Sequence, residues 1–192
     1  MNYLAHALLS SNNEAHLIGN FIADHLRGNK FDNLPATVIE GVKMHRQIDA
    51  FTDTHELFKS SKRIFYTKHE KYSGVLIDIY FDHLLAKNFF EVADIRLNTF
   101  AQKVYGIYNN NKHLLPKSSE RFLNYVINNN IYEAYAEKDG INTVLAHLSQ
   151  RINNGVQLQN SMTDFIEHEK ILEENFKLFF QEAQQRLSLI HI

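Results

Sequence analysis

Apolar residues recur along the chain at intervals of three and four positions, which is the spacing of one face of an α-helix. Only seven glycines and two prolines occur in 192 residues, too few for the many turns of an all-β protein. We therefore expect an all-α fold, a single-domain helical bundle over residues 1–192. Helices are predicted over residues 14–27, 36–51, 72–90, 92–109, 117–129, 139–153 and 159–188, with another after Thr54 that carries Phe58 and Phe65.

Local signals mark some of the expected helix ends. Gly28 is a candidate cap for the end of the first helix, because glycine tolerates the left-handed backbone found there. Pro35 suits the first turn of the second helix, where the N–H that it lacks would have no partner. The asparagine triplets 109–111 and 128–130 are predicted to be loops.

Composition narrows the class of protein. Charged residues are nearly balanced, 20 Lys+Arg against 22 Asp+Glu, which argues against a broadly basic nucleic-acid-binding protein. The absence of cysteine excludes a disulfide scaffold, a thiolate zinc site and a cysteine nucleophile. No apolar run approaches the roughly 20 residues of a membrane span, and the N-terminus does not resemble a signal peptide. We expect a cytoplasmic protein with neither nucleic acid nor membrane as partner.

The most apolar predicted helix, residues 72–90, carries two carboxylates on one stripe. Asp78 and Asp82 are four positions apart and share that stripe with Val75 and Leu85. Burying both acids is costly unless a cation compensates them: an arginine, a lysine or a metal ion. The alternative is purely structural, with each aspartate bonded to a buried arginine or to backbone N–H groups.

A second stripe combines an imidazole with an acid. His45 and Asp49 follow Val38 and Val42 on one face of the helix over 36–51. Their spacing suits two ligands of one metal ion, whereas a histidine alone would more often be a core residue. Asp53, four positions further on, would either extend this acid cluster or cap the next helix.

Three other residues are candidates on weaker grounds. Asp24 lies on the apolar face of the first helix, either as a further ligand or as a helix-end acid bonded to Arg27. His83 adjoins Asp82 but points about 100° away, so it would reach the rim of the same site or face a neighbouring helix. His6 carries little weight on sequence alone.

Acids with one or two imidazoles on three helices suit Mn²⁺, Mg²⁺ or Fe²⁺ better than a structural zinc site. A divalent ion in such a site can activate water and neutralise phosphate oxygens, so the residues indicate phosphoester hydrolysis without identifying the substrate. Separately, a locally basic segment is either a solvated face or a docking surface for an acidic partner. It contains Lys59, Lys62, Arg63, Lys68 and Lys71.

Several motifs, in order and spacing, resemble those of the acyl carrier protein phosphodiesterases. They are Met1-Asn2-Tyr3-Leu4-Ala5-His6, Gly19-Asn20-Phe21-Ile22-Ala23-Asp24, Arg27-Gly28-Asn29, Met44-His45-Arg46-Gln47-Ile48-Asp49 with Thr52-Asp53, and Asp78-Ile79-Tyr80-Phe81-Asp82-His83. The resemblance implies an all-helical fold distantly related to the HD phosphohydrolases. It also implies a divalent-metal enzyme, with Mn²⁺ as the expected ion, that acts on acyl carrier protein.

The implied reaction is hydrolysis, by metal-activated water, of the phosphodiester joining 4′-phosphopantetheine to a serine of holo acyl carrier protein. The resemblance assigns a metal shell to Asp24, His45, Asp49, Asp78 and Asp82. It makes Arg46 and His83 candidates for binding phosphate oxygens or transferring protons. Because carrier proteins are acidic, we expect Lys59, Lys62 and Arg63 to bind this partner.

The sequence departs from the family pattern at one position near Arg151, and two other functions are compatible with the residues. The family has a second basic residue beside Arg151, where this chain has Gln150, so Arg151 is not assigned to the site. The first alternative is a metal phosphohydrolase that acts on a nucleotide or another small phosphoester. The second is a helical binding module with no catalytic activity, in which buried acids serve the structure alone.

Overall fold

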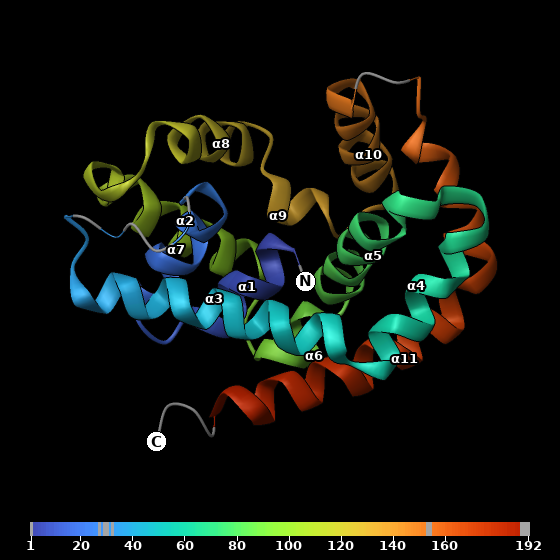
Figure 1. The fold of residues 1–192 in the computed structure, drawn as a ribbon, viewed down its shortest axis with the longest axis horizontal. Coiled ribbons are helices and arrows are strands. Elements are labelled where there is room, and N and C mark those ends of the chain that lie inside the picture. Colours follow the sequence, from blue (N-terminus) through green and yellow to red (C-terminus); the bar gives the residue numbers. More distant parts are fainter. Residues whose placement is uncertain (1, 27, 29–30, 32, 153–154, 189–192) are drawn as a thin grey trace.

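Helices follow one another through short turns in the computed structural model, which describes residues 2–26, 28, 31, 33–152 and 155–188 (Figure 1). These residues contain no strand, which confirms the all-α expectation. The elements in chain order are α1 (Tyr3–Ser10), α2 (Glu14–Ile22), η1 (Ala23–His25), α3 (Ala36–Thr54), α4 (Glu56–His69), η2 (Glu70–Tyr72), α5 (Ser73–Lys87), α6 (Phe89–Ala93), α7 (Leu97–Asn110), η3 (Lys112–Leu114), α8 (Lys117–Asn128), α9 (Ile131–Ala134), α10 (Lys138–Ile152), η4 (Leu158–Ser161) and α11 (Met162–Ser188).

Several predicted boundaries are corrected. The helix expected over 14–27 ends at Ile22 and continues only as the 3₁₀ turn η1, while Gly28 takes its left-handed φ of 64° in the following loop. The segment 72–90 is divided between α5 and α6. The short helices α1 and α9 were not predicted. Arg27, proposed as a partner of Asp24, lies outside the described residues.

The junction between α3 and α4 also differs from the prediction. α3 runs on to Thr54, so Asp53 is an exposed residue within it. His55 caps α4 instead, because its Nδ1 accepts a hydrogen bond from the Leu57 N–H at 3.2 Å. Asp53 therefore neither caps α4 nor lines the cavity around His45 and Asp49.

α5 lies at the centre of the fold, as its nearly uniform hydrophobicity predicts. Tyr80 is fully buried and stacks on Phe165 of α11, with ring centroids 4.4 Å apart and planes 6° from parallel. α4 and α11 pack on one side of α5 and α1 on another (Figure 1). Neither α5 nor any other helix in the described ranges has the length and hydrophobicity needed to cross a membrane.

Two glycines allow α2 and α3 to approach closely. A Cβ atom on Gly19 would stand 1.9 Å from the Val38 carbonyl oxygen, and one on Gly41 would stand 2.3 Å from the His16 carbonyl oxygen. Both obstacles are backbone atoms, which a side-chain rotation cannot relieve. The close contact brings Asn20, next to Gly19, against the face of α3 that carries His45.

We expect Gly19→Ala to lower the free energy of unfolding by about 3 kcal/mol, because overpacking a rigid contact forces the backbones apart. The control is Gly106→Ala in α7, where the added Cβ meets nothing within 4 Å. That variant should gain up to about 1 kcal/mol, since alanine favours the helix. Urea denaturation of the two variants measures both effects. Equal stability of the two variants would contradict the role given to the α2–α3 contact.

Candidate metal centre

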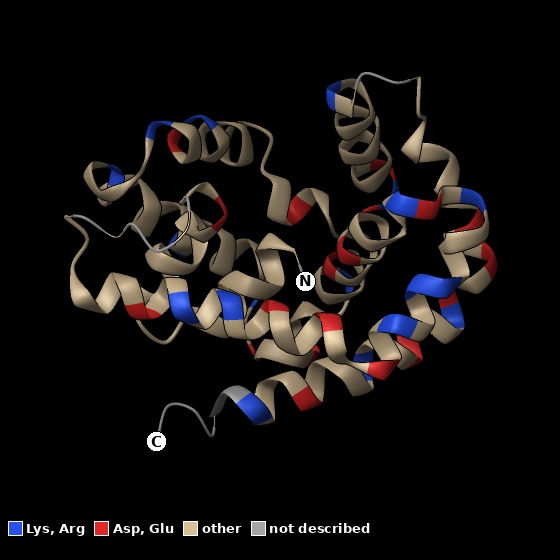
Figure 2. Ribbon diagram, viewed as in Figure 1, with Lys and Arg blue, Asp and Glu red and all other residues tan. Residues whose placement is uncertain are grey.

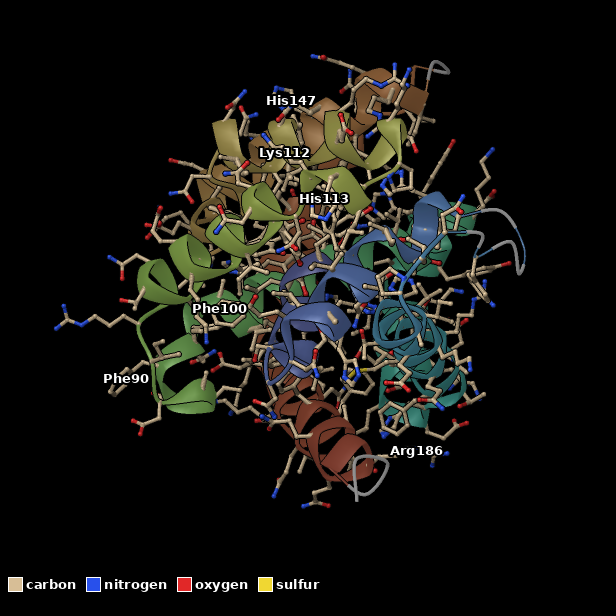
Figure 3. The ribbon with its side chains drawn as sticks, turned by 90° about the vertical axis from the view of Figure 1, so that its left-hand side faces the viewer. Phe90, Phe100, Lys112, His113, His147 and Arg186 are labelled. Carbon is tan, nitrogen blue, oxygen red and sulfur yellow. The ribbon has the colours of Figure 1, made fainter. Side chains whose placement is uncertain are left out.

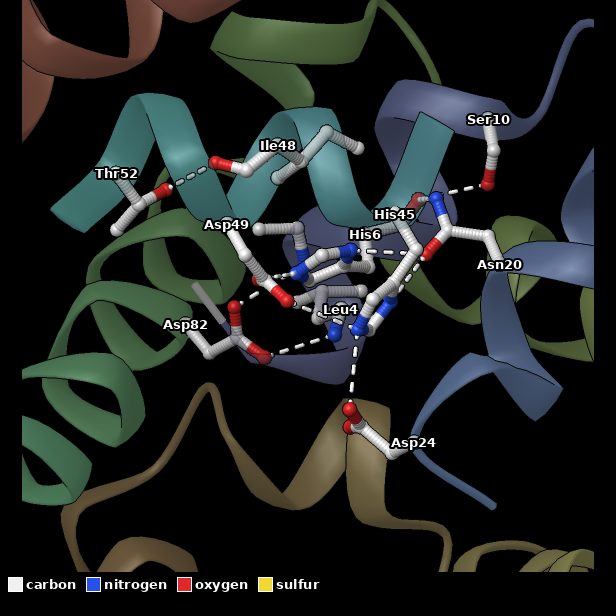
Figure 4. Close-up of polar contacts among 11 residues, drawn as sticks. Leu4, His6, Ser10, Asn20, Asp24, His45, Ile48, Asp49, Thr52 and Asp82 are labelled. Atoms are coloured by element: carbon white, nitrogen blue, oxygen red, sulfur yellow. Dashed lines mark hydrogen bonds and ion pairs between the residues drawn. The ribbon is translucent and has the colours of Figure 1, made fainter. Parts of the chain in front are cut away.

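Two buried imidazoles from different helices meet beside α2. His6 of α1 and His45 of α3 are 5% and 7% exposed, and their rings stack with centroids 4.3 Å apart (Figure 4). Both Nδ1 atoms lie within hydrogen-bond distance of the same oxygen, Asn20 Oδ1, at 2.8 Å and 2.9 Å respectively. A single amide on α2 therefore holds both rings.

The hydrogen-bond network determines which ring nitrogens carry protons. Asn20 Nδ2 donates to the His6 carbonyl at 3.3 Å, which leaves Oδ1 facing the two rings as an acceptor. His6 and His45 must then each donate Nδ1–H to that oxygen. Their Nε2 atoms point to the opposite side. Metal-binding histidines are commonly oriented in this way, with the far N–H donated to an oxygen acceptor.

Carboxylates face both Nε2 atoms. Asp49 Oδ1 is 3.1 Å from His6 Nε2, and Asp49 Oδ2 is 3.0 Å from His45 Nε2. Asp24 Oδ1 is a further neighbour of His45 Nε2, at 3.1 Å. The side chains of Asp24 and Asp49 are 56% and 42% exposed, so the group opens to solvent on their side while the imidazoles stay buried.

This arrangement suits a cation. Unprotonated Nε2 atoms would direct lone pairs at carboxylate oxygens only 3.0–3.1 Å away, which is unfavourable unless a proton or a metal ion lies between them. His6, His45 and Asp49 each offer a ligand atom, and these atoms lie within 4.8 Å of one another. Imidazole nitrogens with carboxylate oxygens match the preferences of Mn²⁺, Fe²⁺ and related ions. The described residues could thus hold a divalent metal ion.

Charge coupling within the group shifts its pKa values. Burial lowers the pKa of His45, but hydrogen bonds to Asp24 and Asp49 outweigh burial and raise that pKa to about 9. Burial raises the pKa of Asp49, and hydrogen bonds from His45 and His6 overcome this and hold it well below the usual range. His6 differs, since burial lowers its pKa. In the metal-free group a proton on His45 offsets one of the two carboxylate charges that face it, and metal binding would displace that proton.

A small cavity of 150 Å³ lies against this group. Asp78 of α5 lines it, as do Tyr3, Asn20, Asp24, His45 and Asp49 among others. Four of the five predicted metal-shell residues are therefore neighbours around one cavity. His6, which carried little weight in the sequence, lies at the centre of the group.

Asp82, the fifth predicted metal-shell residue, has a different environment. It is fully buried, and its oxygens accept the backbone N–H groups of Leu4 at 2.7 Å and Ala5 at 3.1 Å (Figure 4). Burial raises the pKa of Asp82 to about 7, although these hydrogen bonds oppose the rise. Asp82 does not line the cavity. It holds the first turn of α1, the helix that carries His6.

Arg46 and His83, the predicted catalytic residues, do not line the cavity either. Arg46 is exposed, donates from Nη2 to the Gly28 carbonyl at 2.6 Å, and lies over the Phe31 ring. His83 is buried, and its Nδ1 hydrogen-bonds with the Tyr135 carbonyl at 2.7 Å. Among the described residues, these partners of Arg46 and His83 lie away from the cavity, so a catalytic role for either residue stays a prediction.

The basic residues expected to bind a partner, Lys59, Lys62 and Arg63, belong to α4, which carries several basic positions (Figure 2). Lys59 pairs with Glu56 of the preceding turn at 3.0 Å, whereas Lys62 and Arg63 are exposed. Lys68 forms an ion pair with Asp164 of α11.

Sequence reasoning gave too little weight to His6 and none to Asn20 and Tyr3. A signal did exist for Asn20: it sits between Gly19 and Phe21 on a helix whose other inward residues are apolar. A buried amide needs partners, and here the partners are the two imidazoles.

Comparison with known proteins agrees with these observations. The acyl carrier protein phosphodiesterase family matches residues 1–183. The acyl carrier protein phosphodiesterase of Serratia proteamaculans is 29% identical over 187 residues, which cover 97% of each chain. Those of Salmonella agona and Salmonella dublin are 30% identical over 184 residues, 94% of each chain. No solved structure matches significantly, so the distant relation to HD phosphohydrolases stays a prediction. The chain belongs to the acyl carrier protein phosphodiesterase family.

Proposed function

We propose that this protein hydrolyses the phosphodiester between 4′-phosphopantetheine and the serine of holo acyl carrier protein. The products are apo acyl carrier protein and free 4′-phosphopantetheine, and the cofactor is a divalent ion, with Mn²⁺ as the expected one. Family membership supports the substrate. The observation that carries the chemistry is the pair of imidazoles, His6 and His45, held by Asn20 against Asp49 beside a cavity. The proposal includes a cytoplasmic location, because the enzyme would encounter acyl carrier protein, a protein of lipid synthesis, in that compartment.

We assign separate roles in the reaction to residues around the cavity. His6, His45, Asp49 and Asp24 would hold the ion, which supplies positive charge to the phosphoryl oxygens and makes water more acidic. Asn20 fixes both imidazoles with their Nε2 atoms toward the acids. We assign to Asp78, on the α5 wall of the same cavity, the acceptance of a proton from the attacking water. That proton is then available to the departing serine oxygen.

The test is intact mass spectrometry of holo acyl carrier protein after incubation with the purified protein. With Mn²⁺ the carrier should lose the mass of one phosphopantetheine, and with EDTA it should not. Asp78→Asn should bind Mn²⁺ and fold normally but release little product, since positioned acid–base groups contribute about 10²–10⁴-fold. An unchanged carrier mass, with folded and metal-loaded protein, would overturn the substrate assignment. A screen of nucleotides and other small phosphoesters would then distinguish a different phosphohydrolase from a binding module.

We expect the double variant Lys62→Glu/Arg63→Glu to lower kcat/KM for holo acyl carrier protein about tenfold or more. The reason is that reversing two exposed charges removes attraction to an acidic partner and adds repulsion. Hydrolysis of the small diester bis(p-nitrophenyl) phosphate should stay within about twofold of wild type. Steady-state kinetics with both substrates at low salt measure the difference.

The matched control is Lys112→Glu in η3, an exposed lysine on a different face of the molecule from α4 (Figure 3). It changes net charge without touching α4. One outcome would contradict the prediction: Lys112→Glu lowers kcat/KM for holo acyl carrier protein as much, for each reversed charge, as Lys62→Glu/Arg63→Glu does. In that case the net charge of the protein alone would explain the effect, and α4 would not be a docking surface.

A further inference from the structure

A larger cavity, of 740 Å³, opens next to the metal centre. It lies between α8 and α10, which stand on either side of α9 in Figure 1, with residues of α5 in its floor. Asn2 and Tyr3 line both this cavity and the small cavity of the metal centre. The two cavities therefore adjoin at the start of α1. We call the larger one the α8–α10 groove.

The walls of the α8–α10 groove are largely apolar. Phe122 of α8 contacts Tyr3, with ring centroids 4.4 Å apart, so an aromatic surface leads out from the metal centre. Val75 of α5 and Val144 and Leu148 of α10 continue the apolar lining, and all three are partly exposed. The groove's volume lies within the range of about 300–1,000 Å³ typical of sites for small organic ligands.

Polar groups are placed at intervals along this apolar surface. His25 Nε2 is buried and has no hydrogen-bond partner within the described ranges. Tyr125 and His147 bridge α8 and α10 through a contact of 3.1 Å between the hydroxyl oxygen and Nδ1. Arg151 also lines the groove. Burial raises the pKa of Tyr3 and the Arg151 guanidinium opposes that rise, so this charge reaches the junction with the metal centre.

We propose that the α8–α10 groove receives the pantetheine arm of the substrate. The inference rests on the proposed function. The arm is an extended chain of methylene and methyl groups interrupted by two amides, which matches apolar walls with a few polar side chains between them. The junction at Asn2 and Tyr3 lies where the arm ends in its phosphodiester, beside His6 and Asp49. Arg151, which the sequence left unassigned, lines the same groove. Its positive charge would therefore face the phosphopantetheine part of the substrate and not the carrier protein.

The experiment compares Leu148→Trp, which fills the groove, with Val92→Trp, a partly buried valine in a cavity on another side of the molecule. Free pantetheine, which lacks the phosphate, should bind the wild-type holoenzyme in calorimetry and inhibit turnover competitively. In Leu148→Trp, pantetheine binding should be lost and KM for holo carrier protein should rise about tenfold or more. Mn²⁺ affinity should stay within about twofold, because Leu148 does not line the metal cavity. Val92→Trp should behave as wild type in all three measurements.

Unchanged pantetheine binding in Leu148→Trp would overturn the inference, as would an equal loss in Val92→Trp. If Leu148→Trp also loses Mn²⁺ affinity, the milder Val144→Met decides, with pantetheine expected to bind about threefold more weakly. The proposed function fails separately: it fails if the wild type leaves holo carrier protein unchanged. Pantetheine binding to the wild type, lost on filling the groove, would then still identify the groove as a site for this chain.

Discussion

His6→Ala is expected to bind Mn²⁺ at least about 100-fold more weakly than the wild type and to lose a similar factor in carrier-protein turnover. Removing the imidazole takes away one of the three ligand atoms that lie within 4.8 Å of one another. Loss of a group that merely orients a metal ligand already costs about 10–100-fold, so loss of the ligand itself should cost more. Calorimetric titration of the metal-free protein with Mn²⁺ measures the change directly.

Two further variants make this prediction specific. His113→Ala removes an exposed imidazole in η3 (Figure 3) and should leave Mn²⁺ affinity unchanged. Asn20→Ala keeps both ligands but removes the acceptor that orients them, so its affinity should fall between the other two, by about 10–100-fold. If His6→Ala keeps wild-type affinity while remaining folded, the metal group is not built around His6, and Asp24, His45 and Asp49 must suffice.

The part of the site that lies on single helices could be predicted from the sequence. His45 and Asp49 are four positions apart on α3, and helix geometry alone turns both side chains the same way. The contribution of α1 could not be predicted with the same reasoning. An eight-residue helix has little periodicity, and the side chain of its N-cap residue, Asn2, makes no capping hydrogen bond. His6 is positioned by contacts from far along the chain, because Asp82 accepts the N–H groups of the first turn of α1 and Asn20 holds the His6 ring.

Asp78 and Asp82 show the limit of a stripe argument. The sequence predicted that both side chains point to the same face of α5. The residues on one face of a helix do not specify which neighbouring element packs against each of its turns. Asp78 lines the cavity, whereas α1 covers Asp82 with its backbone N–H groups. The same limit applies to His83, whose neighbour across the interface is the Tyr135 carbonyl. Tertiary packing decides these partners, and no local spacing encodes it.

Asp82→Ala should have the largest effect on stability among these variants, lowering the free energy of unfolding by about 3–5 kcal/mol. The substitution leaves the N–H groups of Leu4 and Ala5 buried without an acceptor, and each orphaned donor costs about 1–3 kcal/mol. Because α1 carries His6, Mn²⁺ affinity should fall as well. Chemical denaturation in EDTA separates the loss of stability from the loss of metal. The exposed Asp53→Ala on α3 is the control and should change stability by less than about 0.5 kcal/mol.

The conservative variant Asp82→Asn should reveal the titration of this carboxyl in the metal-free protein. Burial raises the pKa of Asp82 to about 7 from an ordinary value of 3.8, so the folded state binds this proton more tightly than the unfolded state does. Its contribution to stability is therefore fully present below about pH 4 and is lost as pH rises through 7. Asparagine cannot titrate, so the stability of wild type relative to Asp82→Asn should decrease between pH 4 and 7 and change little above that. Denaturation of both proteins in EDTA at pH 5, 6, 7 and 8 measures this difference. Parallel pH profiles would show that Asp82 stays ionised in the fold, with the N–H groups of α1 outweighing the cost of burial.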